Sequence, residues 1–154
     1  MSRTSLLSAA QRILPLLLCL LIGCSRGREA ADAFTQDLGR ASGKLEVGQE
    51  LRMDTVNKGD WNRMFVFPPY TPISEIESAL KIKASSAIQS ARVSERDDIN
   101  LFIFLNGENI QLVAAVPRKI IDLSVGKEVQ PLNRSRSVFK KVSVDEPLIL
   151  AAGI

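Results

Sequence analysis

The segment from residue 100 to residue 116 constrains the fold more than any other part of the chain. Residues 100–105 are apolar at nearly every position, which is typical of a strand in the centre of a sheet. Asn106 and Gly107 then supply a two-residue turn, and residues 110–116 form a second, mostly apolar run. This pattern predicts a β-hairpin, whose two strands are antiparallel neighbours in a sheet.

Four further strands are predicted around this hairpin. The clearest, at residues 63–67, is rich in aromatic and branched side chains and is closed by Pro68 and Pro69. A weaker strand precedes it, and a last pair near the C-terminus is joined at residues 145–147. The four strands are expected at 51–56, 63–67, 137–144 and 148–151.

A helix is predicted between the strand at 63–67 and the hairpin. Thr71 can cap its N-terminus, and Pro72 suits the first helical position. Ile73, Ile76 and Leu80 then fall on one helical face, which should pack on the sheet. Together these elements predict an α+β fold, in which a small antiparallel β-sheet packs against one or two helices.

The N-terminal segment has the anatomy of a signal peptide. Arg3 and Arg12 provide a positively charged start, residues 13–22 are mostly apolar, and the small Gly23 follows. A membrane-spanning helix needs about 20 apolar residues, and this run has roughly half that length. We therefore interpret residues 1–23 as a signal peptide that is removed from the mature protein.

Leu21, Ile22, Gly23 and Cys24 resemble the lipobox of bacterial lipoproteins, and they occupy the position of that motif after the apolar run. The resemblance implies that the Cys24 thiol receives a diacylglycerol group and that cleavage before Cys24 frees an amine for further acylation. It also implies attachment to the cell membrane, facing the extracytoplasmic side. Ser25, in place of aspartate, resembles sorting to the outer membrane in an organism that has one. The alternative is an ordinary secretory signal in which Cys24 is incidental.

The mature chain is expected to contain a tether and one domain. Residues 24–43 are mostly polar and small, with only a faint helical spacing through Ala30, Phe34 and Leu38. We interpret them as the lipidated N-terminus and a flexible tether that clears the lipid headgroups. Residues 44–154 are then a single α+β domain, long enough for one modest core.

The composition argues against several classes of function. Two of the 20 Lys and Arg residues and none of the 17 Asp and Glu residues lie before Cys24, which leaves a formal charge of +1 on residues 24–154. Such a balance gives no reason to expect a nucleic-acid partner. The chain has no histidine and only two cysteines, so the usual ligands for zinc, copper or haem are missing and no cofactor is expected. The lack of histidine also removes Ser-His and Cys-His catalysis.

The single tryptophan and the single tyrosine, Trp61 and Tyr70, flank the predicted strand at 63–67. A tryptophan, an amide, a basic residue, a short strand and a Pro-Tyr-Thr turn before a helix resemble a pattern of small uncharacterised bacterial envelope proteins. The resemblance extends more loosely through the hairpin at 100–116, with Arg118 and Asp122 beyond it. It implies a fold and an envelope location but no reaction. Two interpretations of these residues remain open. In one, Trp61 caps the core and the Tyr70 hydroxyl bonds the backbone at the entrance of the helix. In the other, Trp61, Arg63, Tyr70 and Arg118 form a ligand site.

A local basic cluster lies near the C-terminus. Arg134, Arg136, Lys140 and Lys141 could meet lipid phosphates or other polyanions near a membrane. On a strand, Lys140 and Lys141 would point to opposite faces, so at least one of them is expected to be an ordinary solvated charge.

These features predict a non-catalytic lipoprotein that binds or scaffolds a protein or polymer of the cell envelope. One alternative is a ligand-binding module that uses Trp61 and Tyr70. Another is an envelope enzyme that relies on carboxylates or on a Ser-Lys pair, which the fold would have to bring within hydrogen-bonding distance.

Overall fold

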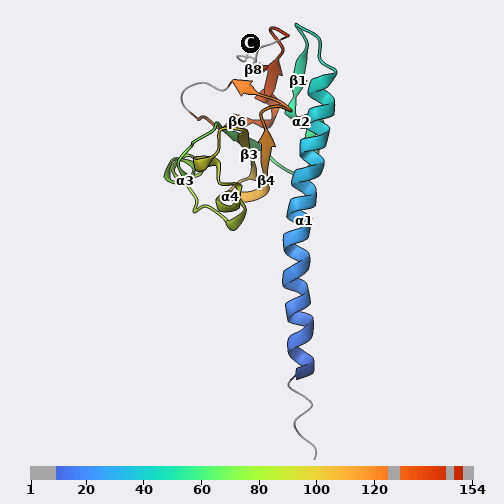
Figure 1. Ribbon diagram of the computed structural model, residues 1–154, viewed down its shortest axis with the longest axis vertical. Helices are drawn as coiled ribbons and strands as arrows, with labels where there is room; N and C mark the ends of the chain where they lie inside the picture. Colours follow the sequence, from blue (N-terminus) through green and yellow to red (C-terminus); the bar gives the residue numbers. More distant parts are fainter. Residues whose placement is uncertain (1–9, 125–128, 145–147, 151–154) are drawn as a thin grey trace, which may run out of the picture.

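The computed structural model describes the backbone of residues 10–124, 129–144 and 148–150 (Figure 1). The predicted α+β class is confirmed, with helices packed against antiparallel strands. The helices are α1 (Ala10–Gly43), α2 (Met53–Val56), α3 (Ile73–Leu80) and α4 (Ser86–Ala91), with short 3-10 turns at Val93–Glu95 and Arg134–Arg136. Among the described residues, no helix is both long enough and apolar enough to cross a membrane.

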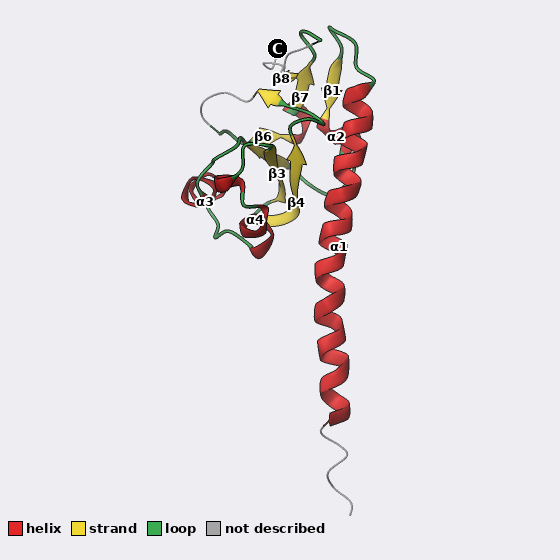
Figure 2. Cartoon of the chain, viewed as in Figure 1, coloured by secondary structure: helices red, strands yellow, loops and turns green. Residues whose placement is uncertain are grey.

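The strands form two sheets (Figure 2). The central sheet has the order β4-β3-β2-β6, and all of its neighbours are antiparallel. The smaller sheet has the order β1-β7-β8-β5, in which only the β5–β8 pair is parallel. The strands are β1 (Glu50–Arg52), β2 (Arg63–Phe67), β3 (Ile99–Asn106), β4 (Asn109–Pro117), β5 (Leu123–Ser124), β6 (Leu132–Asn133), β7 (Val138–Lys140) and β8 (Leu148–Leu150).

The central sheet is covered on both faces. Successive side chains of a strand point to opposite sides, so its strands contribute to two separate cores. One face carries Phe102 and Phe104 and packs against α1 and the smaller sheet, and we call this the α1-side core. The other face carries Leu101 and Ile103 and packs against α3 and α4, and we call it the α3-side core. This arrangement explains why residues 101–105 are all apolar, since neither face of β3 meets water.

The predicted hairpin is confirmed, but its turn lies one residue later than expected. Asn106 pairs with Asn109, so the two turn residues are Gly107 and Glu108. Gly107 has a φ of 59°, a conformation that glycine adopts without the steric cost of a side chain. The register also shifts between Phe104 and Leu105.

The predicted helix at α3 is confirmed, but Thr71 does not cap it. Pro72 occupies the capping position, and the Thr71 side chain is buried and donates a hydrogen bond to the Pro68 carbonyl oxygen at 2.6 Å. Thr71 therefore closes the turn between β2 and α3. Ile76 and Leu80 are buried against the sheet and Ile73 is partly buried there, as the periodicity predicts.

The strand expected at 51–56 is mostly a helical turn. It pairs with β7 only as far as Arg52, and Met53 then starts α2 with its side chain fully buried. The Arg52 guanidinium binds both carboxylate oxygens of Asp54 at 3.2 and 2.7 Å, and the Thr55 hydroxyl donates to the Arg52 carbonyl oxygen. These local side-chain contacts compete with an extended backbone. The last predicted pair of strands is present as β7 and β8, and its connection at 145–147 lies outside the described residues.

Residues 24–43 differ most from expectation, because they continue α1 and do not form a flexible tether. Phe34 and Leu38 are buried in the α1-side core, where the Phe34 ring meets Phe102 and Phe104 edge-on. The apolar positions recur three or four residues apart, which places them in one stripe of the helix. That stripe is Ala31, Phe34, Leu38 and Ala41.

Gly39 brings α1 close to the segment that follows β4. A Cβ atom at residue 39 would lie 2.9 Å from Cγ2 of Ile120, which is closer than van der Waals contact allows. One turn further along, the Ser42 hydroxyl donates to the Ile120 carbonyl oxygen at 3.3 Å. The C-terminal half of α1 is therefore attached to the body by packing and by a hydrogen bond.

Candidate functional site

The structure divides the four predicted binding residues between the two ends of the central sheet. Trp61 and Arg63 lie where β2 begins, whereas Tyr70 follows its other end. The backbone N–H of Arg118 donates to the carbonyl oxygen of Asp98, and that of Tyr70 donates to the carbonyl oxygen of Arg96, both just before β3. Arg118 therefore lies at the same end of the sheet as Tyr70. No described contact or hollow joins all four residues, so they do not form the shared concave surface that the ligand-site interpretation requires.

Trp61 is a lid on the α1-side core. Only 2% of the residue is exposed, and its ring meets Phe104 edge-on with the centroids 5.0 Å apart. The indole Nε1–H donates to the Asn57 carbonyl oxygen at 2.8 Å, so the polar atom of the ring is satisfied within the protein. These contacts are those of a core lid, which is the first of the two interpretations considered above.

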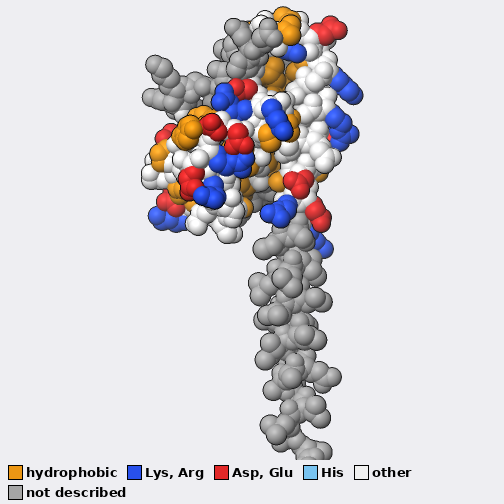
Figure 3. Space-filling view, in the orientation of Figure 1, with side chains coloured by type: hydrophobic (Ala, Val, Ile, Leu, Met, Phe, Trp, Pro, Cys, Tyr) orange, Lys and Arg blue, Asp and Glu red, His pale blue; other side chains and the backbone are white. Residues whose placement is uncertain are grey.

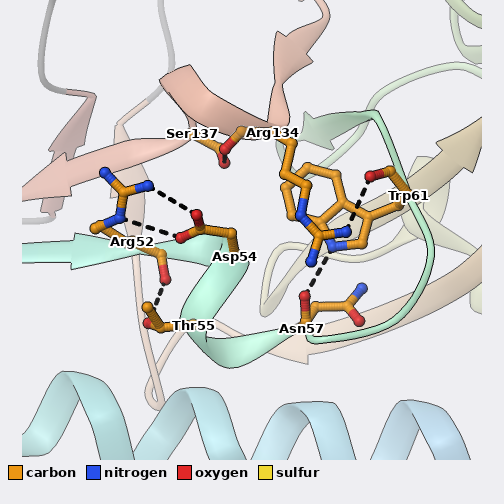
Figure 4. A network of polar contacts seen from close by, with 7 residues as sticks. All are labelled: Arg52, Asp54, Thr55, Asn57, Trp61, Arg134 and Ser137. Atoms are coloured by element: carbon orange, nitrogen blue, oxygen red, sulfur yellow. Dashed lines mark hydrogen bonds and ion pairs between the residues drawn. The ribbon is translucent and has the colours of Figure 1, made fainter.

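Arg134 covers the outer face of the Trp61 ring, with its guanidinium carbon 5.0 Å from the ring centroid (Figure 4). Its Nη1 donates to the carbonyl oxygens of Gly59 and Trp61 at 2.7 and 3.1 Å. The Arg134 backbone N–H also donates to the Asn62 carbonyl oxygen. Arg134 thus holds the loop between α2 and β2 in place, a role for which the sequence carries no local signal.

The predicted basic cluster is not a single cationic patch. Arg134 is directed onto Trp61, and Lys141 donates to the Leu45 carbonyl oxygen at 3.0 Å. Arg136 and Lys140 are exposed. Two of the four cations therefore serve the internal structure of the domain.

Arg63 binds the hairpin turn through Nη2, which donates to the Gly107 carbonyl oxygen at 2.8 Å. Its Nε is buried and has no hydrogen-bond partner among the described residues. A shallow hollow next to it is lined by Asn62, Arg63, Gly107, Glu108 and Asn133. The Arg63 side chain is half-buried and bonded to the turn, so its role in the structure is to stabilise the hairpin.

Tyr70 is exposed over 60% of its surface. Its backbone has a φ of 62°, and its N–H is shared between the carbonyl oxygens of Val93 and Arg96. The backbone of Tyr70 therefore stabilises a turn while its ring faces solvent. A lone exposed ring, with neither Trp61 nor Arg63 beside it, provides one contact surface and not a site.

Arg118 is paired with Asp122. The guanidinium binds both carboxylate oxygens at 3.1 and 2.5 Å, and this pairing, with a smaller contribution from Asn100, lowers the pKa of Asp122. The buried Asn100 amide donates to the same carboxylate at 3.3 Å. The pair borders a hollow of about 430 Å³ that also contains Ser42 and Lys141. Because Asp122 already neutralises Arg118, an incoming anion would have to displace this partner.

The most enclosed of the hollows described here lies between α1 and the loop before β2. Its volume is about 280 Å³, and Phe34, Asp37, Asp60 and Gln111 contribute to its walls together with the edge of Trp61. Within the described part of the chain, no three acidic or cysteine side chains gather as they would around a metal ion. The hollow is small and mixed in polarity, and its walls contain no paired nucleophile and base.

The remaining predicted site residue is Cys24. Its backbone is part of α1, and its side chain lies outside the described part of the structure. No known protein family, curated protein or solved structure gives a significant match to this chain.

Proposed function

We propose that this chain is a lipid-anchored protein of the cell envelope, attached through Cys24, with a domain that binds or scaffolds an envelope component without catalysis. The observation that carries the proposal is the order of features at the N-terminus. A basic start and an apolar run of about half a membrane span are followed at once by Leu21, Ile22, Gly23 and Cys24.

Lipid attachment at this position is energetically sufficient for an anchor. Each CH₂ group of an acyl chain contributes about 0.8 kcal/mol on burial in the bilayer, and two or more chains hold a protein durably at a membrane. Confinement to the membrane raises the concentration of the domain next to other envelope components. Localisation by itself is thus a mechanism by which a small domain without a catalytic centre can act.

The described core contacts of α1 all lie after Cys24. Among the described residues, the core contacts of α1 begin at Ala31, and residues 26–30 are exposed. A mature chain that starts at Cys24 would therefore retain every described core contact of the helix. The ligand-binding alternative built on Trp61 and Tyr70 is less well supported, because one ring is buried and the other lies beyond the opposite end of β2.

The test is to express the full precursor in a bacterial host and to compare it with Cys24→Ser and Cys19→Ser. Cys19 is a matched control, because it lies in the apolar run and would leave with the signal peptide. The wild type and Cys19→Ser should gain the mass of acyl groups and sediment with membranes, and Cys24→Ser should do neither. An unmodified wild-type chain in the soluble fraction would overturn the proposal.

A further inference from the structure

The helix α1 connects the lipidation residue directly to the core. Six residues separate Cys24 from Ala31, the first residue of α1 that packs on the core, and the backbone between them is helical. At a rise of 1.5 Å per residue, this segment is about 10 Å long. A spacer that is both short and helical fixes the distance of the domain from the lipid far more tightly than a flexible linker of the same number of residues.

The direction of the helix relative to the body is also fixed. Phe34 and Leu38 are buried, and Gly39 and Ser42 lie against Ile120. The attachment thus extends from Phe34 to Ser42, more than two turns of α1, which is enough to define the direction of its axis as well as its position. The domain and its spacer therefore form one rigid unit.

One end of the body lies near the level at which the described side chains of α1 begin. The part of α1 before the body projects beyond it on the side of α4 (Figure 1). In the space-filling view, the lower margin of the body reaches the level at which the described side chains of α1 begin, at residue 26 (Figure 3). Ala30 and Phe34 border the same hollow as Asp60 and Gln111, which places the start of β4 and its turn toward this end.

We infer that this end of the domain, formed by α4 and the hairpin turn at Gly107 and Glu108, faces a lipid surface. The inference rests on the proposed lipid anchor at Cys24. The opposite end, which contains Val47 beyond the C-terminus of α1, faces away from the bilayer. Exposed Arg26 and Arg28 lie next to the lipid, in the position where lipid phosphates are reached, and Glu29 and Asp32 on the same segment offset their charge. Geometry, more than net charge, therefore sets the orientation.

The experiment measures the height of two points above the membrane. Glu108→Cys and Val47→Cys are made separately in the full precursor, and each lipidated protein is purified from a bacterial host. Both residues are exposed, so a fluorescent label is tolerated at either place. The labelled proteins are inserted into vesicles of phosphatidylcholine and phosphatidylglycerol that contain an acceptor dye on a lipid headgroup, and energy transfer is recorded.

Transfer from residue 108 should exceed transfer from residue 47 several-fold, because a domain of this size is roughly 30 Å across. A matched variant with a flexible Gly-Ser insertion of about ten residues after Arg28 retains the lipid but loses the rigid spacer. In that variant the difference between the two positions should largely disappear. Equal transfer in the uninserted, lipidated protein, or stronger transfer from residue 47, would overturn the orientation and leave the lipid anchor intact. Absence of acyl mass in the same preparation would overturn both.

Discussion

Arg134 is the residue whose role is least visible in the sequence. Its position among other basic residues predicts contact with an anion. In the structure, however, its guanidinium covers Trp61 and donates to two backbone carbonyl oxygens. Hydrogen bonds from a charged donor stabilise a fold by about 1.5–3 kcal/mol when they are partly buried. The cation–π contact adds to this. Trp61, for its part, depends on Arg134 to shield its outer face.

Replacement of Arg134 by methionine should therefore lower the free energy of unfolding by about 2 kcal/mol. The methionine keeps most of the apolar contact with the ring but loses both hydrogen bonds. Urea unfolding followed by Trp61 fluorescence measures the change, and the chain has no other tryptophan to confuse the signal.

Arg136→Met is the control for the loss of one positive charge from the same segment. Arg136 is exposed, and this substitution should change the stability by less than about 0.5 kcal/mol. Equal effects of the two substitutions would contradict the role assigned to Arg134.

At the scale of elements, α1 is the main addition to the predicted fold. In its residues 26–43 apolar side chains are few, and between them lie arginine, glycine and acidic residues that are typical of a tether. The helix is stable because Phe34 and Leu38 find a complementary surface on β3 and β4, since tertiary packing contributes more to helix stability than propensity does. An isolated segment of this composition would not be expected to remain helical.

Phe34→Ala should destabilise the domain by about 3–5 kcal/mol, because it leaves a cavity beside Phe102 and Phe104. Gln36→Ala lies on the exposed side of the same helix and should have little effect. The midpoints of thermal unfolding of the two variants and of the wild type measure these effects. If residues 26–43 were only a tether, both substitutions would leave the midpoint unchanged.

At the scale of the whole molecule, the central sheet couples two cores. The α1-side core includes Leu51 and Phe139 of the smaller sheet, and the α3-side core includes Ile88 of α4. Since β2 and β3 contribute side chains to both cores, neither core can be lost while the sheet remains fully ordered. The two sheets and the described helices are expected to unfold as one unit.

If the domain unfolds as one unit, substitutions in either core should affect the same unfolding transition. Leu51→Ala and Ile88→Ala, one in each core, should each shift the urea midpoint by an amount corresponding to about 2–5 kcal/mol. Within each variant, the midpoints from Trp61 fluorescence and from far-ultraviolet circular dichroism should coincide. Separate transitions for the two signals in Ile88→Ala would show instead that α3 and α4 unfold independently of the α1-side core.

The sequence by itself determined the hairpin, β2 and α3, because turn residues, alternation and helical periodicity are local properties of the chain. It also contains the N-terminal pattern on which the proposed anchor rests. Only the tertiary structure decided that α1 belongs to the core, that the strands divide into two sheets, and that Arg134 covers Trp61. These arrangements join segments far apart in the chain, such as β1 and β7, in which Glu50 pairs with Lys140, and their energy comes from packing between surfaces that no local pattern specifies.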